Sequence, residues 1–178
     1  MNGKSVLYIA MSEDGFIAGE NDNIDFLNPY QVDGEDYGYH EFISHVENIL
    51  VGRKTYETVL GMGYPYHPDK SVYIATRSSR QSDADKHMYY NGNLKSLLNK
   101  LKSSYQSIIY CDGGAELARS LLAEDLIDEI ILSVIPVKLE TGILLFEKGE
   151  VPNSFSLNKK QTFSSGLVQL TYILNNSL

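Results

Sequence analysis

The chain has 178 residues, of which 43% are hydrophobic and 21% are charged, a composition that suits one globular domain with a sizeable core. A formal net charge of -8 argues against a nucleic-acid partner, and the single cysteine, Cys111, excludes an intrachain disulfide. No apolar run is long enough to span a membrane and the N-terminus lacks a cleavable-signal pattern, so we expect a cytoplasmic protein without a membrane partner.

Short buried strands and amphipathic helices alternate along the first two thirds of the chain. We expect strands at residues 4–11, 49–52, 72–76, 107–111 and 127–137. We expect helices at residues 34–47, 54–60, 94–101 and 115–123. The stretch 12–33 is rich in Gly, Asn and Asp and is typical of a long functional loop.

The last third of the chain carries only strand patterns. Residues 144–146 and 154–162 are candidate strands, and 167–174 alternates after a Ser165-Gly166 turn, which predicts a closing hairpin. No repeat or linker divides residues 1–178, so we expect a single domain. The pattern predicts an α/β fold with a mainly parallel central sheet and an antiparallel C-terminal hairpin.

Glycines or cations follow three of the predicted strands. The Asp112-Gly113-Gly114 turn joins a strand to a helix, where backbone N–H groups and the helix dipole favour an anion such as a pyrophosphate. The alternative is a tight turn without a ligand. No Cys/His spacing is typical of a metal site, and we expect none.

The other two strand ends are basic. Gly52-Arg53-Lys54-Thr55 places two cations at a helix start, which an anionic ligand would explain, although two solvated surface charges explain it equally well. Thr76-Arg77-Ser78 follows a strand with an arginine and hydroxyls, as at sites for the 2′-phosphate of NADP; the alternative is a polar turn.

Four segments, MSEDGFIAG, VGRKTYE, ATRS and DGGAELARSLLAEDLIDEIILSVIPVKLETGILLF, follow one another in the order of the motifs of a known superfamily. They span roughly residues 6–146 and resemble the dihydrofolate reductase-like superfamily, in particular the branch of the riboflavin-biosynthesis reductase, the RibD C-terminal domain. The resemblance implies a three-layer fold with NADPH lying across the strand ends.

By motif position, the resemblance also assigns the cofactor contacts. Ala10, Ile17 and Ala18 would flank the nicotinamide. Gly52, Arg53, Lys54 and Thr55 would contact phosphates, and Thr76, Arg77 and Ser78 would hold the adenosine end. Gly113, Gly114, Ala115 and Glu116 would lie along the pyrophosphate and nicotinamide, with a cis peptide between the two glycines.

Reduction by hydride also requires a proton, which dihydrofolate reductases take from a carboxylate on the first helix. Counting back from Gly52-Arg53 points to Asp36, whereas anchoring on Phe42 points nearer Gly38. Asp25 and Glu35 are further alternatives, and helix capping is the other interpretation of Asp36. Asp25, Tyr37 and His40 are candidates to line the substrate pocket; Tyr37 and His40 could instead face solvent.

The residues expected on the substrate side differ from those of both riboflavin reductases and dihydrofolate reductases. No Lys or Arg occurs between Lys4 and Arg53, Phe16 stands where riboflavin reductases often carry Arg, and the chain has no Trp. We therefore expect an NADPH-dependent oxidoreductase acting on a small heterocyclic C=N or C=O compound, nearest to 5-amino-6-(5-phosphoribosylamino)uracil reductase. The alternatives are a dihydrofolate reductase, a non-catalytic NADPH-binding module and a phosphate-binding transferase.

The predicted strand at 127–137 is apolar on both faces for much of its length. A strand of this kind must be covered on both sides. Relatives of this branch commonly pair through their sheets, so we expect a homodimer; the alternative is a central strand covered by the chain's own helices.

Overall fold

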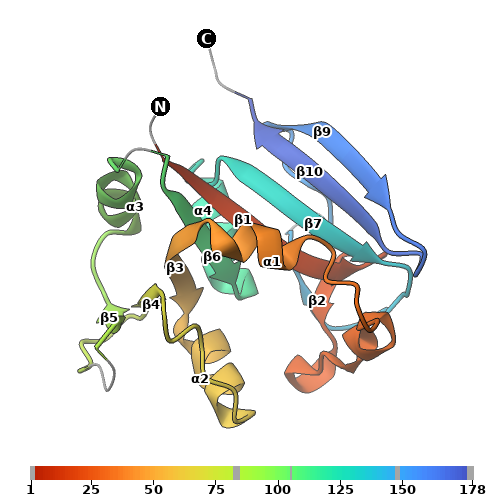
Figure 1. Ribbon diagram of the computed structural model, residues 1–178, viewed down its shortest axis with the longest axis horizontal. Helices are drawn as coiled ribbons and strands as arrows, with labels where there is room; N and C mark the ends of the chain where they lie inside the picture. The colour runs from red at the N-terminus through yellow and green to blue at the C-terminus, as the bar shows by residue number, and fades with distance from the viewer. Residues whose placement is uncertain (1–2, 82–84, 105, 147–148, 176–178) are drawn as a thin grey trace.

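The computed structural model describes residues 3–81, 85–104, 106–146 and 149–175. An eight-stranded sheet in the order β5-β4-β3-β6-β1-β7-β10-β9 forms its centre (Figure 1). The parallel strands are β1 (Lys4–Ser12), β3 (Val46–Gly52), β4 (Ser71–Ala75), β5 (His87–Tyr90), β6 (Ile108–Gly113) and β7 (Glu129–Ile135). The antiparallel hairpin is β9 (Phe155–Thr162) and β10 (Val168–Leu174), which continues the sheet beyond β7.

Helices cover both faces of the sheet, as the three-layer prediction requires. They are α1 (Tyr39–Ser44), α2 (Arg53–Gly61), α3 (Leu94–Lys102) and α4 (Ala115–Ala123). Two short 3-10 helices, η1 (Glu20–Asp22) and η2 (Asp25–Tyr30), follow β2 (Phe16–Ala18), which pairs with β8 (Ile143–Leu144) beside the main sheet. No helix within the described residues has the length and apolar character needed to cross a membrane.

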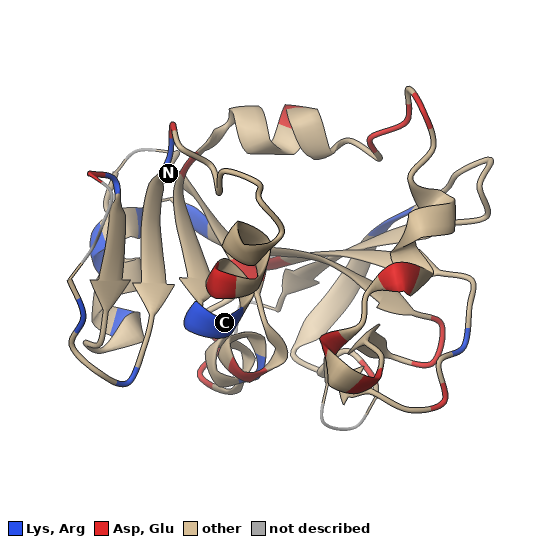
Figure 2. Cartoon of the chain, turned by 90° about the horizontal axis from the view of Figure 1, so that it is seen from below, with Lys and Arg blue, Asp and Glu red and all other residues tan. Residues whose placement is uncertain are grey.

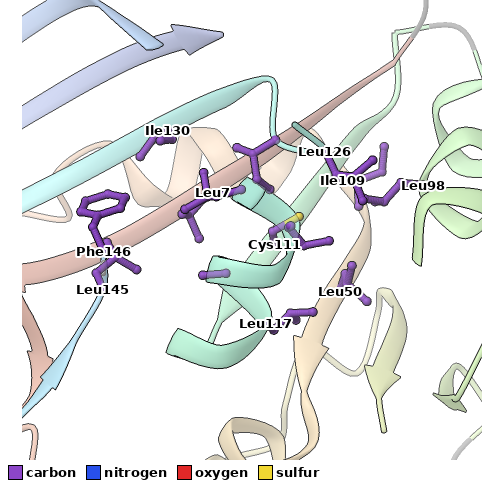
Figure 3. Close-up of a cluster of buried hydrophobic side chains, with 14 of the residues drawn as sticks. Leu7, Leu50, Leu98, Ile109, Cys111, Leu117, Leu126, Ile130, Leu145 and Phe146 are labelled. Atoms are coloured by element: carbon purple, nitrogen blue, oxygen red, sulfur yellow. The ribbon is translucent and has the colours of Figure 1, made fainter. Parts of the chain in front are cut away.

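The alternation of side chains along β6 divides the core into two clusters. Ile109 and Cys111 face α3 and α4 and pack with buried leucines such as Leu98 and Leu117 (Figure 3). Tyr110 faces the other way and packs with residues of α1 and α2. Because successive strand residues point to opposite faces, one buried strand anchors helices on both sides.

Leu7, at the centre of β1, is fully buried. We expect Leu7→Ala to lower the free energy of unfolding by about 2–5 kcal/mol, because it removes buried methyl groups and leaves a cavity. The matched change Leu157→Ala, at a half-exposed position of β9, should stay within about 0.5 kcal/mol. Urea denaturation measures both values, and equal losses would contradict this account of the core.

Among the predicted helices and strands, the helix expected at residues 34–47 differs most from the structure. Gly34 and Gly38 both adopt positive φ, +80° and +83°, so the helix starts only at Tyr39 and ends at Ser44. Val46, which we expected on the helix, is a buried residue of β3. The strands β2 and β5 were not predicted, because three or four residues are too few to show a period.

β7 is covered on both faces largely by its own chain. Ile130 and Leu132 lie in the main core, and Ser133 on the opposite face is buried beneath Gln169, whose Nε2 lies 3.4 Å from its hydroxyl. Ile131 stays half-buried and Ile173 on β10 is 38% exposed. The homodimer therefore stays a prediction, which light scattering at micromolar concentration would test.

Candidate functional site

One pocket of about 890 Å³ runs along the carboxyl-terminal ends of β4, β3, β6 and β1. This volume is within the usual range for small-molecule sites, about 300–1,000 Å³. Ligands of open α/β sheets bind at this edge, because parallel strands end there together and helices begin there.

The end of the pocket nearest β4 is basic. Thr76, Arg77 and Ser78 line it directly after β4, and Arg53 and Lys54 line it from the first turn of α2. The structure thus brings together the two basic segments that we predicted to hold the phosphates and the adenosine end. Arg80 and Arg119 also line the pocket and were not predicted.

Four of these cationic side chains form ion pairs with carboxylates. Glu57 accepts from Arg53 at 2.6 Å and from Arg80 at 3.2 Å. Lys54 lies 2.7 Å from Asp22, and Arg77 pairs with Glu116. All of these side chains are substantially exposed, so each ion pair contributes little stability, and an anionic ligand can take the place of a carboxylate.

Two helix N-termini meet in the middle of the pocket. Neither α2 nor α4 has a side-chain cap at its first turn, and their N-cap residues are Gly52 and Gly114. Thr55 Oγ1 accepts the Gly114 N–H at 3.1 Å, and Gly114 and Ala115 line the pocket. Uncapped N–H groups with a positive dipole end are suited to a pyrophosphate.

The expected cis peptide between the two glycines is wrong: the described residues contain no cis peptide bond. The turn instead depends on Gly113, which adopts a φ of +88°. A Cβ at this position would lie 3.3 Å from Ile9 Cδ1, and Gly113 itself does not line the pocket. Gly113 therefore shapes the turn, while Gly114 faces the ligand space.

The opposite end of the pocket, nearest β1, is apolar. Ala10, Ile17 and Ala18, which we predicted to flank the nicotinamide, line it together with several side chains that we did not predict. Those are Ile9 on β1, Ile24 and Leu27 around η2, Val59 and Met62 on and after α2, and Ile143 on β8. The lining therefore changes from basic to apolar along the order β4, β3, β6, β1.

A carboxyl group, Asp112, lies between the two ends. It is a lining residue near the end of β6 and is half-buried. The hydroxyls of Tyr66 and Tyr110 donate to its Oδ2 and Oδ1 respectively. Burial raises the pKa of Asp112, and the two tyrosine hydrogen bonds only partly oppose this effect.

The tyrosines around Asp112 act as hydrogen-bond donors. Burial and the Asp112 charge raise the pKa of Tyr66 and of Tyr110 above the ordinary value, so both stay protonated. Their two hydrogen bonds to Asp112 favour its ionised form, whereas burial favours the neutral acid and is the larger effect. Asp112 therefore keeps its proton to a higher pH than an exposed aspartate does.

Asp36, the predicted proton donor, does not line the pocket. Its carboxylate accepts the backbone N–H groups of Gly38 and His40 at 3.0 and 2.8 Å, at the start of α1. These bonds hold the pKa of Asp36 below its usual value. The structure thus places Asp36 as a helix-capping residue, the other interpretation of its sequence position.

The other predicted substrate residues also lie outside the pocket lining. The His40 side chain is 85% exposed and lies 2.6 Å from Asp36. Tyr37 donates to the carbonyl of Tyr30 and stacks edge-on against Phe163, so it ties the preceding loop to the C-terminal hairpin. Asp25 is exposed in η2, although its neighbour Ile24 lines the pocket.

The sequence contained one signal that could have identified Asp112. An acidic residue directly after the apolar run Ile108-Ile109-Tyr110-Cys111 lies on a strand buried on both faces, so its carboxyl must be paired or functional. We had treated Asp112 only as part of a turn. Tyr66, 46 residues earlier in the chain, gave no local signal.

Known proteins show the same fold over nearly the whole chain. The uncharacterized protein YwjB of Bacillus subtilis (strain 168) is 42% identical over 177 residues, which cover 97% of this chain and 99% of YwjB. The crystal structure of the "putative riboflavin biosynthesis protein" from Shewanella sp. PV-4 superposes with a TM-score of 0.85 at 27% identity, over 96% of this chain and 98% of that one.

A dihydrofolate reductase of Enterococcus faecalis, solved with NADP(H), superposes with a TM-score of 0.70 at 18% identity over 99% of both chains, which confirms the dihydrofolate reductase-like fold. The family model for the RibD C-terminal domain matches residues 4–169, which include every strand end that lines the pocket. The chain therefore belongs to the RibD C-terminal domain family.

Proposed function

We propose that the protein is an NADPH-dependent reductase that transfers a hydride to a small heterocyclic C=N or C=O substrate. The observation that carries this proposal is the pocket itself, which is basic at β4, apolar at β1 and has the half-buried carboxyl of Asp112 between them. A dinucleotide with an anionic end and a planar, reactive end matches this order. Membership of a reductase family and the fold shared with dihydrofolate reductase support it.

The donor set fits NADPH along the whole pocket. Arg77 with its neighbouring hydroxyls, Thr76 and Ser78, would hold the 2′-phosphate. The first turns of α2 and α4 would hold the pyrophosphate through backbone N–H groups, together with Arg53 and Lys54. Ala10, Ile17 and Ala18 would pack against the nicotinamide. When bound, NADPH supplies a hydride and leaves as NADP⁺.

Asp112 would supply the matching proton. As the hydride adds to the carbon of a C=N or C=O bond, the π pair moves to the heteroatom, which takes the proton of Asp112. Tyr66 and Tyr110 then stabilise the carboxylate with the hydrogen bonds that they already make, and a solvent proton restores the acid. A module that only binds NADPH needs no such carboxyl, so this group favours an enzyme.

We expect the protein to bind NADPH at least about tenfold more tightly than NADH, because a charge-assisted contact to phosphate contributes about 1.5–3 kcal/mol. Arg77→Ala should weaken NADPH binding about 10–100-fold and leave NADH binding nearly unchanged. Lys100→Ala, an exposed cation of α3 outside the pocket, is the control. Fluorescence titration measures all the Kd values; equal wild-type affinities for the two cofactors would refute this assignment.

A further inference from the structure

We infer that the substrate is an uncharged planar heterocycle that carries no phosphate group. This inference rests on the proposed function and specifies the substrate class of the same pocket. It comes from the charge and polarity of the lining at the β1 end, beside Asp112.

The order of the strands fixes which end of the pocket receives the substrate. The cations of the lining follow β4 and β3 or lie on α4, whereas the lining around β1, β2 and β8 consists of Ile9, Ala10, Ile17, Ala18 and Ile143. A dinucleotide whose phosphates occupy the basic end has its reactive ring at the β1 end. The substrate must contact this ring, so it must bind at the β1 end, where the lining is apolar.

The apolar wall of the pocket also includes side chains from two helices. Ile24 and Leu27 approach from η2 and its start, and Val59 and Met62 from the end of α2. Ile24 is 40% exposed and Met62 is 51% exposed. Exposed apolar side chains around a pocket gain free energy when an apolar surface covers them, at about 25 cal/mol per Å².

The described cation that contacts this end is Lys54, which belongs to the first turn of α2, where the cofactor pyrophosphate would bind, and which Asp22 neutralises. Of the charged lining residues, Asp22 is engaged with Lys54 at 2.7 Å, and Asp112 receives two tyrosine hydroxyls. A phosphate group here would lie near two carboxyl groups, and its desolvation would not be compensated.

The long segment that surrounds this end is also poor in cations. No Lys or Arg occurs between Lys4 and Arg53, the segment that forms β2, η1, η2 and α1. Figure 2 shows this part of the molecule with acidic segments, while Lys and Arg gather mainly on the side of β3, β4 and α3. The field around the substrate end therefore opposes an anionic substrate.

Two matched pairs of probes test the inference. The first is 5-amino-6-(5-phosphoribosylamino)uracil and the same compound without its phosphate; the second is dihydrofolate and 6-methyl-7,8-dihydropterin, which lacks the anionic tail. Calorimetry with the NADP⁺-loaded protein gives each Kd. We expect the uncharged member of at least one pair to bind about tenfold or more tightly than its anionic partner, and to be reduced with the higher kcat/KM.

A variant that introduces a positive charge tests which part of the pocket disfavours anionic substrates. Met62→Arg places a cation in the apolar wall and should strengthen binding of the phosphorylated uracil compound about tenfold. Leu60→Arg, in the last turn of α2 and outside the lining, should not. The inference would be overturned if both anionic probes bound as tightly as their uncharged partners or more tightly. It would also be overturned if none of the four probes bound, or if Met62→Arg had no effect. Titration with NADPH alone reports separately on the proposed function, because it requires no substrate.

Discussion

Replacing Asp112 by Asn is expected to lower kcat/KM for reduction by about 10²–10⁴-fold, the usual contribution of a positioned general acid. Asn retains the size and polarity of the side chain but carries no transferable proton. The Kd for NADPH should change little, because the cofactor contacts lie on other residues of the pocket. Stopped-flow measurement of NADPH oxidation separates the loss in the chemical step from any loss in binding.

Asp36→Asn is the matched control, since it makes the same change at the residue that the sequence alone favoured. Asp36 caps α1 outside the pocket lining, so its loss should affect stability slightly and kcat/KM by less than about threefold. If Asp36→Asn abolished activity and Asp112→Asn did not, the assignment of the proton donor would be reversed.

The pH dependence of the reaction follows from the raised pKa of Asp112. In the proposed mechanism the acid form of Asp112 is the active one. It persists to higher pH than that of an exposed aspartate and is lost as the pH rises through the raised pKa. We therefore expect kcat/KM to be constant on the acidic side and to fall on the alkaline side. Asp112→Asn should remove this fall, and an unchanged pH profile in the variant would assign the titration to another group.

Replacing Gly114 by Val is expected to weaken NADPH binding at least about 100-fold while the protein stays folded. A Cβ at this position would lie 2.9 Å from Thr55 Oγ1, the atom that accepts the Gly114 N–H. The added side chain would therefore separate the first turns of α2 and α4 and occupy the space where a pyrophosphate would approach the backbone.

Gly61→Val is the control for this prediction, because Gly61 ends α2 and has open space around the position of a Cβ. It should leave the Kd for NADPH within about twofold. Circular dichroism would verify that both variants are folded. Gly114→Val that binds NADPH with wild-type affinity would show that the cofactor does not approach the backbone at this turn.

The fold could be predicted from the sequence where the hydrophobic pattern is long. The alternation in β10, the apolar run of β7 and the leucine spacing of α3 each gave the correct element within a few residues. The prediction for the region before β3 was wrong because the conformation there depends on two glycines with positive φ, Gly34 and Gly38. These glycines divide a pattern that otherwise resembles one long helix.

The sequence also predicted one end of the pocket better than the other. The cofactor end is built from short segments around Arg53, Arg77 and Gly114, so local motifs predicted which residues come together. The proposed proton donor depends on a contact between distant parts of the chain, Tyr66 with Asp112, whereas counting along the sequence points to Asp36. The apolar wall around Met62 was missed for the same reason.

A crystal structure of the complex with NADPH would test the central claim most directly. The account predicts the 2′-phosphate at Arg77, the pyrophosphate at the first turns of α2 and α4, and the nicotinamide against Ala10 and Ile17, with Asp112 facing the free side of the ring. A cofactor bound in the opposite direction, or outside this pocket, would contradict it.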